Sequence, residues 1–173
     1  MRKIFLITAI TFIFFLIEFV FSNFFGCWLK PNFLILLIIF VDLHLGIRYG
    51  LFVAILAGLL KDSFGIGVFG VNIFSFVLCV YVTTLARRYF FYDVEFGFLR
   101  ILMAFLMSFL NIVVSYILNS MFSRIDFYQM LIFVMLPEVL ATTLVASSIF
   151  KGLKRCVLKL SVWLLFLYFS SWP

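Results

Sequence analysis

Residues 31–70 read PNFLILLIIFVDLHLGIRYGLFVAILAGLLKDSFGIGVFG, and this stretch decides how the chain folds. An apolar run that begins at Pro31 is interrupted by Asp42, His44 and Arg48 before a second apolar run continues. Polar side chains within strongly apolar sequence are costly unless they reach a surface or face another helix. The stretch therefore predicts two short helices joined by a polar hairpin, rather than one long helix.

The composition of the whole chain excludes a soluble protein. Of the 173 residues, 67% are hydrophobic and 12% are charged, and the mean hydropathy is +1.32. Soluble domains carry roughly 25% charged residues. The net charge of +6 does not indicate nucleic-acid binding, because basic residues gather on the cytoplasmic side of membrane proteins. The sequence thus predicts an integral membrane protein in contact with the lipid bilayer.

The chain has room for about six spanning helices with short loops, since each span takes roughly 20 apolar residues. We expect an all-α polytopic membrane protein with a six-helix transmembrane domain over residues 1–150. Residues 151–173 form a tail that is basic and then hydrophobic, and that we place in the cytoplasm or at the membrane interface. The predicted helices cover residues 4–22, 33–43, 47–60, 71–86, 99–118 and 129–150.

The basic residues support the hairpin between the second and third helices. With six spans and a cytoplasmic N-terminus, ten basic residues fall inside and three outside, and both termini are cytoplasmic. Merging residues 33–60 into one helix buries Arg48, reduces the inside number to four and raises the outside number to eight. The ten inside residues are Arg2, Lys3, Arg48, Arg87, Arg88, Arg100, Lys151, Lys154, Arg155 and Lys159, and the three outside residues are Lys30, Lys61 and Arg124.

Three of the polar residues within the predicted spans are candidates for a polar site. Glu18 lies about one turn from the outer end of the first helix, where it either reaches the interface or contacts another helix or a partner. Glu138 follows Pro137, which predicts a kink with an acid beside it. Asn111 can donate or accept hydrogen bonds across helices.

Small residues recur every four positions on the third predicted helix, at Gly50, Ala54 and Gly58. Such a face lets another helix approach closely, and that helix belongs either to this chain or to a partner. Asp62 ends the helix before a glycine-rich turn, and either Asp62 or Ser63 can cap the helix that follows.

Catalytic chemistry finds no support in the sequence. Asp42 and His44 lie two residues apart and do not share a helix face, so with Arg48 we expect a solvated, salt-bridged loop. The sequence contains no metalloprotease, nucleophile-elbow or phosphate-loop motif. We predict no enzymatic activity, no catalytic residues, no metal site and no cofactor.

The order of several features resembles the rod shape-determining protein MreD family. Those features are Lys30-Pro31-Asn32 before an apolar run, then Gly50, then the run from Gly58 to Asp62, and then Gly67 and Gly70 before another apolar helix. The pattern covers about residues 28–90, and the later helices are similar only in character.

The resemblance implies a multi-pass protein of the bacterial inner (cytoplasmic) membrane that belongs to the cell-elongation machinery. It implies a bitopic MreC-like partner and, indirectly, the actin-like MreB and the cell-wall synthase RodA with its transpeptidase. It also implies a fold that resembles the substrate-binding membrane subunit of energy-coupling-factor transporters. The positions that the resemblance marks as important are Pro31, Asn32, Gly58 and Asp62.

We therefore expect a non-catalytic scaffold that supports rod shape and peptidoglycan synthesis by binding its partner. The alternative is the substrate-binding membrane subunit of a vitamin-type transporter, with Glu18, Asn111 and Glu138 as ligand-site candidates. Transporter subunits of that type tend to carry a small-residue face on the first helix. Here Ala9 stands alone among bulky phenylalanines, which counts against transport.

Overall fold

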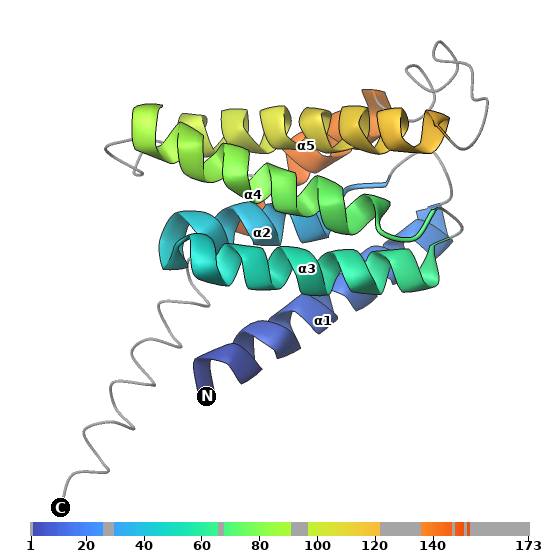
Figure 1. The fold of residues 1–173 in the computed structure, drawn as a ribbon, viewed down its shortest axis with the longest axis horizontal. Helices are drawn as coiled ribbons and strands as arrows, with labels where there is room; N and C mark the ends of the chain where they lie inside the picture. Colours follow the sequence, from blue (N-terminus) through green and yellow to red (C-terminus); the bar gives the residue numbers. More distant parts are fainter. Residues whose placement is uncertain are drawn as a thin grey trace, which may run out of the picture.

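The computed structural model describes residues 2–25, 30–65, 68–90, 97–121, 136–146 and 148–150, together with Gly152. The described elements are helical, and Figure 1 shows them as a bundle. They are α1 (Arg2–Phe25), α2 (Phe33–Leu45), α3 (Ile47–Phe64), α4 (Val71–Phe90), α5 (Gly97–Ser120) and a further helical segment, Leu136–Phe150.

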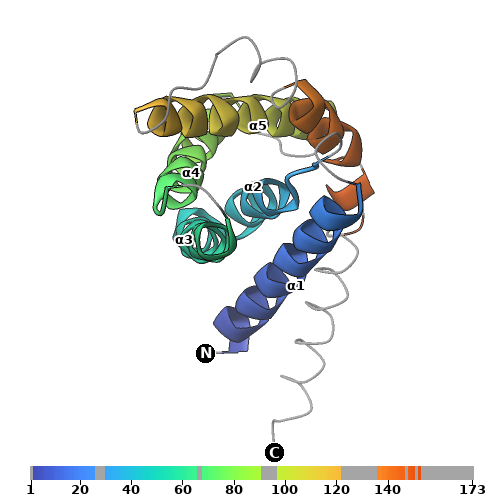
Figure 2. The same ribbon diagram turned by 90° about the vertical axis from the view of Figure 1, so that its right-hand side faces the viewer.

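Helix α2 lies at the centre of the bundle. Every residue from Phe33 to Leu43 is buried, so the helix has no lipid-facing side along this length. A helix that is apolar on all sides is stable when neighbours surround it. Figure 2 shows α2 nearly end-on, with α1, α3, α4, α5 and the orange segment Leu136–Phe150 around it.

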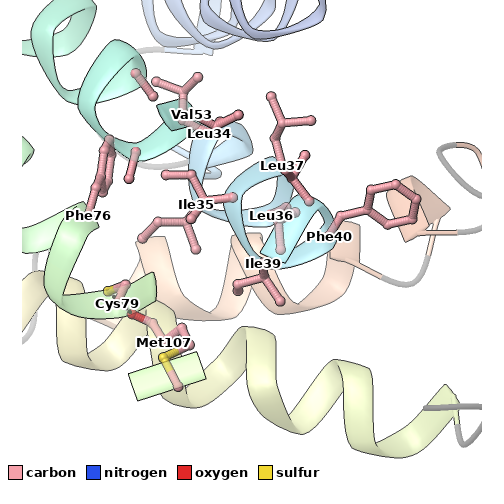
Figure 3. Close-up of a cluster of buried hydrophobic side chains, with 14 of the residues drawn as sticks. Leu34, Ile35, Leu36, Leu37, Ile39, Phe40, Val53, Phe76, Cys79 and Met107 are labelled. Carbon is pink, nitrogen blue, oxygen red and sulfur yellow. Dashed lines mark hydrogen bonds between the residues drawn. The ribbon is translucent and has the colours of Figure 1, made fainter. Parts of the chain in front are cut away.

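The core is built from α2 and the faces turned toward it (Figure 3). Side chains such as Leu36 and Ile39 of α2 are completely buried, as are Val53 of α3 and Phe76 of α4. Met107 contributes from α5 and is 2% exposed. Because lipid is as apolar as these side chains, close van der Waals packing is what holds them together.

The predicted hairpin between α2 and α3 is confirmed. A single residue, Gly46, separates the two helices, and its φ of 90° lies in the left-handed region that favours glycine. Its backbone N–H donates to the carbonyl oxygen of Asp42 at 3.0 Å, which closes the end of α2. Helix α3 continues to Phe64, beyond the predicted end at residue 60.

Within the described residues, three helices are long and apolar enough to cross a membrane, namely those covering Ile4–Phe24, Val71–Tyr89 and Ile101–Ser120. The apolar helices Phe33–Leu45 and Leu136–Phe150 are shorter. With 13 residues, α2 is about 20 Å long, against about 30 Å for the hydrocarbon core of a bilayer. The architecture is that of a polytopic membrane protein.

Two predictions lie largely outside the described residues. Apart from Gly152, the tail over residues 151–173 is not described. Pro137 is the second residue of the described helical segment, so the predicted kink lies at the edge of that segment.

Successive helices run antiparallel in the bundle (Figure 1). Polar residues that form hydrogen bonds between helices lie at both ends of the bundle. One end, here called the Glu18 end, holds Glu18, Asn32, Lys61, Asp62 and Glu138. The opposite end, here called the Arg87 end, holds Asp42, Arg48, Thr84, Arg87 and Arg88.

Candidate functional site

An ion pair between α1 and α3 anchors the Glu18 end. The Nζ of Lys61 donates to Oε1 of Glu18 at 2.9 Å, and the other carboxylate oxygen accepts the backbone N–H of Leu34 at 3.0 Å. The first N–H groups of a helix lack partners within it, so a carboxylate placed there is favourable. Of the two alternatives for Glu18, the structure shows the contact with other helices.

Asn32 ties the start of α2 to the segment Leu136–Phe150. Its Oδ1 accepts the N–H of Ile35 at 3.2 Å and so caps α2, while its Nδ2 donates to Oε1 of Glu138 at 3.3 Å. Its own backbone N–H donates to Oγ1 of Thr142 at 3.0 Å. With an exposure of 2%, Asn32 uses its amide and its backbone N–H in these bonds. Pro31, directly before it, is buried.

Asp62 caps α4, which settles the choice between Asp62 and Ser63. Its carboxylate accepts the backbone N–H groups of Gly70, Asn72 and Ile73 at 2.9, 3.2 and 3.3 Å. The side-chain amide of Asn72 adds a fourth bond at 2.8 Å. Ser63 instead donates to the carbonyl oxygen of Leu59 in its own helix. The turn between α3 and α4 is thus held by one carboxylate.

The small-residue face of α3 packs within the chain. A Cβ added at Gly58 would lie 2.5 Å from the Cα of Ile73, so the backbones of α3 and α4 are in direct contact there. At Gly50, an added Cβ would meet Asp42 at 3.0 Å and Val80 at 3.2 Å. Ala54, between them, is completely buried. This face is therefore occupied by α4 and α2.

The prediction of a solvated loop at Asp42 is wrong. Asp42 is fully buried, and both of its carboxylate oxygens accept the hydroxyl of Thr84 at 3.1 Å. Arg87 donates from Nη1 to the backbone oxygen of Asp42 at 3.2 Å rather than to its carboxylate. His44 is exposed and stacks on Phe40, with ring centroids 4.2 Å apart. The reason is that α4 packs over this turn and supplies a hydroxyl and a guanidinium group.

The three intramembrane polar candidates do not form one site. Glu18 and Glu138 both line a cleft at the Glu18 end, whereas Asn111 lies between α4 and α5. There its Oδ1 and its backbone oxygen accept the hydroxyl of Ser75 at 2.6 and 3.2 Å. Asn111 thus makes the interhelical hydrogen bond that the sequence predicts, away from the two acids.

Sequence reasoning missed the partners of these residues. Lys61 lies 43 positions from Glu18 in the chain. Thr84 and Arg87 lie 42 and 45 positions from Asp42. The one available signal was charge at the end of a predicted span, which indicates an interface position but names no partner.

The cleft at the Glu18 end has a volume of about 520 Å³. It lies between α1, α3, the residues before α2 and the segment Leu136–Phe150. Its lining residues are Phe15, Glu18, Phe19, Ser22, Asn23, Lys30, Pro31, Lys61, Phe64, Gly65 and Glu138. Within the described ranges, no group of three or more His, Cys, Asp or Glu side chains is placed to hold a metal ion.

The family model of the rod shape-determining protein MreD matches residues 1–169, which is nearly the whole chain. The chain belongs to the MreD family. No curated protein and no solved structure matches it. As a member of the MreD family it is a bacterial membrane protein with a role in rod shape determination, and it associates with the shape-determining complex.

Proposed function

We propose that this MreD-family protein is a non-catalytic scaffold of the cell-elongation complex, which supports peptidoglycan synthesis by binding a bitopic MreC-like partner. Through that partner it is linked to MreB and to RodA with its transpeptidase. The family match over residues 1–169 is the observation that carries this proposal. The contribution of a scaffold is binding energy and geometry, which a bundle held by internal hydrogen bonds is suited to provide.

We propose six spans in the bacterial inner membrane, with both termini in the cytoplasm. The Arg87 end carries Arg48, Arg87 and Arg88 on α3 and α4. At the Glu18 end, Lys61 is paired with Glu18 instead. The positive-inside rule therefore favours a cytoplasmic Arg87 end, where α1 also begins.

We propose that the partner's helix docks on α1 rather than on the small-residue face of α3, because α4 and α2 already occupy that face. In the most apolar 18-residue stretch of α1, only 17% is buried inside the bundle, whereas the share is 33% for α4 and for α5. Helix α1 also crosses the bundle obliquely (Figures 1 and 2). Its exposed large side chains include Phe12, Ile13 and Leu16.

Site-specific photocrosslinking in living cells tests the docking face. A photoreactive residue at Phe12 of α1 is expected to capture a single-span partner, while one at Phe105 of α5 serves as the matched control because it is also exposed. Capture at Phe105 and not at Phe12 would place the partner on the opposite helix.

The alternative function, a substrate-binding subunit of a vitamin-type transporter, rests on the cleft that Glu18 and Glu138 line. This alternative also includes the proposal that the fold resembles the substrate-binding membrane subunit of energy-coupling-factor transporters. Purification of the tagged protein in mild detergent, with mass spectrometry of what accompanies it, separates the two functions. An MreC-like protein with cell-wall synthases supports the scaffold, whereas a coupling protein with paired ATPases supports transport.

A further inference from the structure

The cleft at the Glu18 end combines charged groups with an aromatic wall. Its volume of about 520 Å³ falls in the range of roughly 300–1,000 Å³ that small-molecule sites occupy. Scaffolding requires no such cleft, so its chemistry points to a property beyond the proposed function.

Two of its four charges are already used within the protein. Lys61 and Glu18 form an ion pair at 2.9 Å, and Lys61 also lies 5.6 Å from the centroid of the Phe76 ring. Glu18 further accepts the N–H of Leu34. This pair is therefore part of the framework of the cleft.

The other two charges are of opposite sign, and no salt bridge joins either of them to the residues that the structure describes. Lys61 and Lys30 nevertheless lie near enough to Glu138 to attract its charge. Glu138 accepts a neutral amide hydrogen from Asn32 at 3.3 Å, and it forms no salt bridge with any residue that the structure describes. Lys30 is exposed and likewise forms no salt bridge in the described part of the chain. The cleft thus offers one carboxylate and one ammonium group to a ligand.

The remaining wall is aromatic. Phe15 and Phe19 of α1 and Phe64 of α3 form a cluster, in which the ring centroid of Phe64 lies 5.2 Å from that of Phe15 and 6.2 Å from that of Phe19. Phe64 is 63% exposed and Phe19 is 44% exposed, so much of this surface is open to a ligand or to lipid. The wall suits an acyl chain or another apolar group.

We propose that the cleft binds a phosphoethanolamine group, with its ammonium at Glu138 and its phosphate at Lys30. Ammonium and carboxylate form strong charge-assisted hydrogen bonds, and a lysine binds phosphate as a point charge. The group comes from one of two sources, the headgroup of a membrane phospholipid or a soluble phosphoethanolamine molecule. The lipid places its chains along the exposed Phe19 and Phe64, at the end of the bundle where headgroups lie.

Native mass spectrometry of the full-length protein in detergent micelles tests the proposal, with phosphatidylethanolamine, phosphatidylglycerol or soluble phosphoethanolamine added. The test variants are Lys30→Gln and Glu138→Gln, which remove one charge each and leave a polar side chain. The matched control is Arg48→Gln, an exposed cation at the Arg87 end. We expect each test variant to bind about tenfold more weakly than the wild-type protein, and the control to bind equally.

Each outcome bears on the proposal. Retention of phosphatidylethanolamine alone identifies the lipid as the source, and retention of the soluble compound identifies a free ligand. Equal retention of phosphatidylglycerol and phosphatidylethanolamine overturns the proposal, because Glu138 then does not distinguish a headgroup with an ammonium from one without it. Unchanged binding in Lys30→Gln overturns it as well, and this exposed residue can be replaced without disturbing the helix packing. The scaffold role is judged separately, by recovery of the partner.

Discussion

Gly58→Ala tests the closest contact between α3 and α4. The added Cβ would lie 2.5 Å from the Cα of Ile73 and 2.8 Å from its backbone nitrogen. Carbon atoms attract each other at about 3.5–4.0 Å, so α4 must move away by about 1 Å. The obstruction is backbone, which means that a change of side-chain rotamer cannot relieve it.

The expected loss of stability follows from two opposing effects. Overpacking a core costs about 1–3 kcal/mol, and we take the upper end, about 3 kcal/mol, because the backbone of α4 has to shift. Alanine in place of glycine inside a helix returns about 1 kcal/mol. The net loss is about 2 kcal/mol, which changes the folding equilibrium roughly thirtyfold.

The assay is equilibrium unfolding of the purified protein in mixed micelles by sodium dodecyl sulfate, followed by circular dichroism. Gly152→Ala is the matched control, because no atom of the described residues lies within 4 Å of the Cβ it would add. That variant should be as stable as the wild-type protein or slightly more stable. If Gly58→Ala unfolds at the same detergent fraction as the wild-type protein, the direct contact of α3 with α4 is refuted.

Three further predictions concern polar contacts between helices. Asp62→Ala removes the acceptor of four hydrogen bonds at the start of α4 and should cost about 2 kcal/mol in the same unfolding assay. Thr84→Val leaves the buried carboxylate of Asp42 without its hydroxyl donor and should cost about 2 kcal/mol in the free energy of unfolding. A double-mutant cycle of Ser75→Ala and Asn111→Ala should give a coupling energy of about 1 kcal/mol.

Each of these predictions has its own control. Asp62→Asn keeps one acceptor oxygen and should lose less stability than the alanine variant; an equal loss would contradict the capping role. Thr143→Val is the control for Thr84, because the Thr143 hydroxyl donates to the carbonyl oxygen of Val139 in its own helix. A coupling energy near zero would show that Ser75 and Asn111 contribute independently.

Local signals in the sequence were sufficient for several features. Composition excluded a soluble fold, and the polar residues between residues 42 and 48 placed the hairpin where Gly46 forms it. The acid before a glycine-rich turn indicated a cap, and Asp62 caps α4. These features depend on a few neighbouring residues, so they can be read along the chain.

The pairings across the bundle could not be predicted. Nothing near Glu18 indicates that Lys61 lies beside it, and nothing near Asp42 indicates that Thr84 covers it. Both contacts depend on how α1, α3 and α4 cross, which is a property of the assembled helices. The solvated loop expected at Asp42 was wrong for this reason.

The sequence by itself determined the class of protein and the position of the turn between α2 and α3. Only the tertiary structure decided which apolar helix lies inside. Helices α1 and α2 are both strongly apolar, yet α2 is buried from Phe33 to Leu43 and α1 exposes Phe5, Phe12 and Phe24. Lipid is as apolar as a packed helix, so an apolar sequence does not distinguish a helix that faces lipid from one that faces its neighbours.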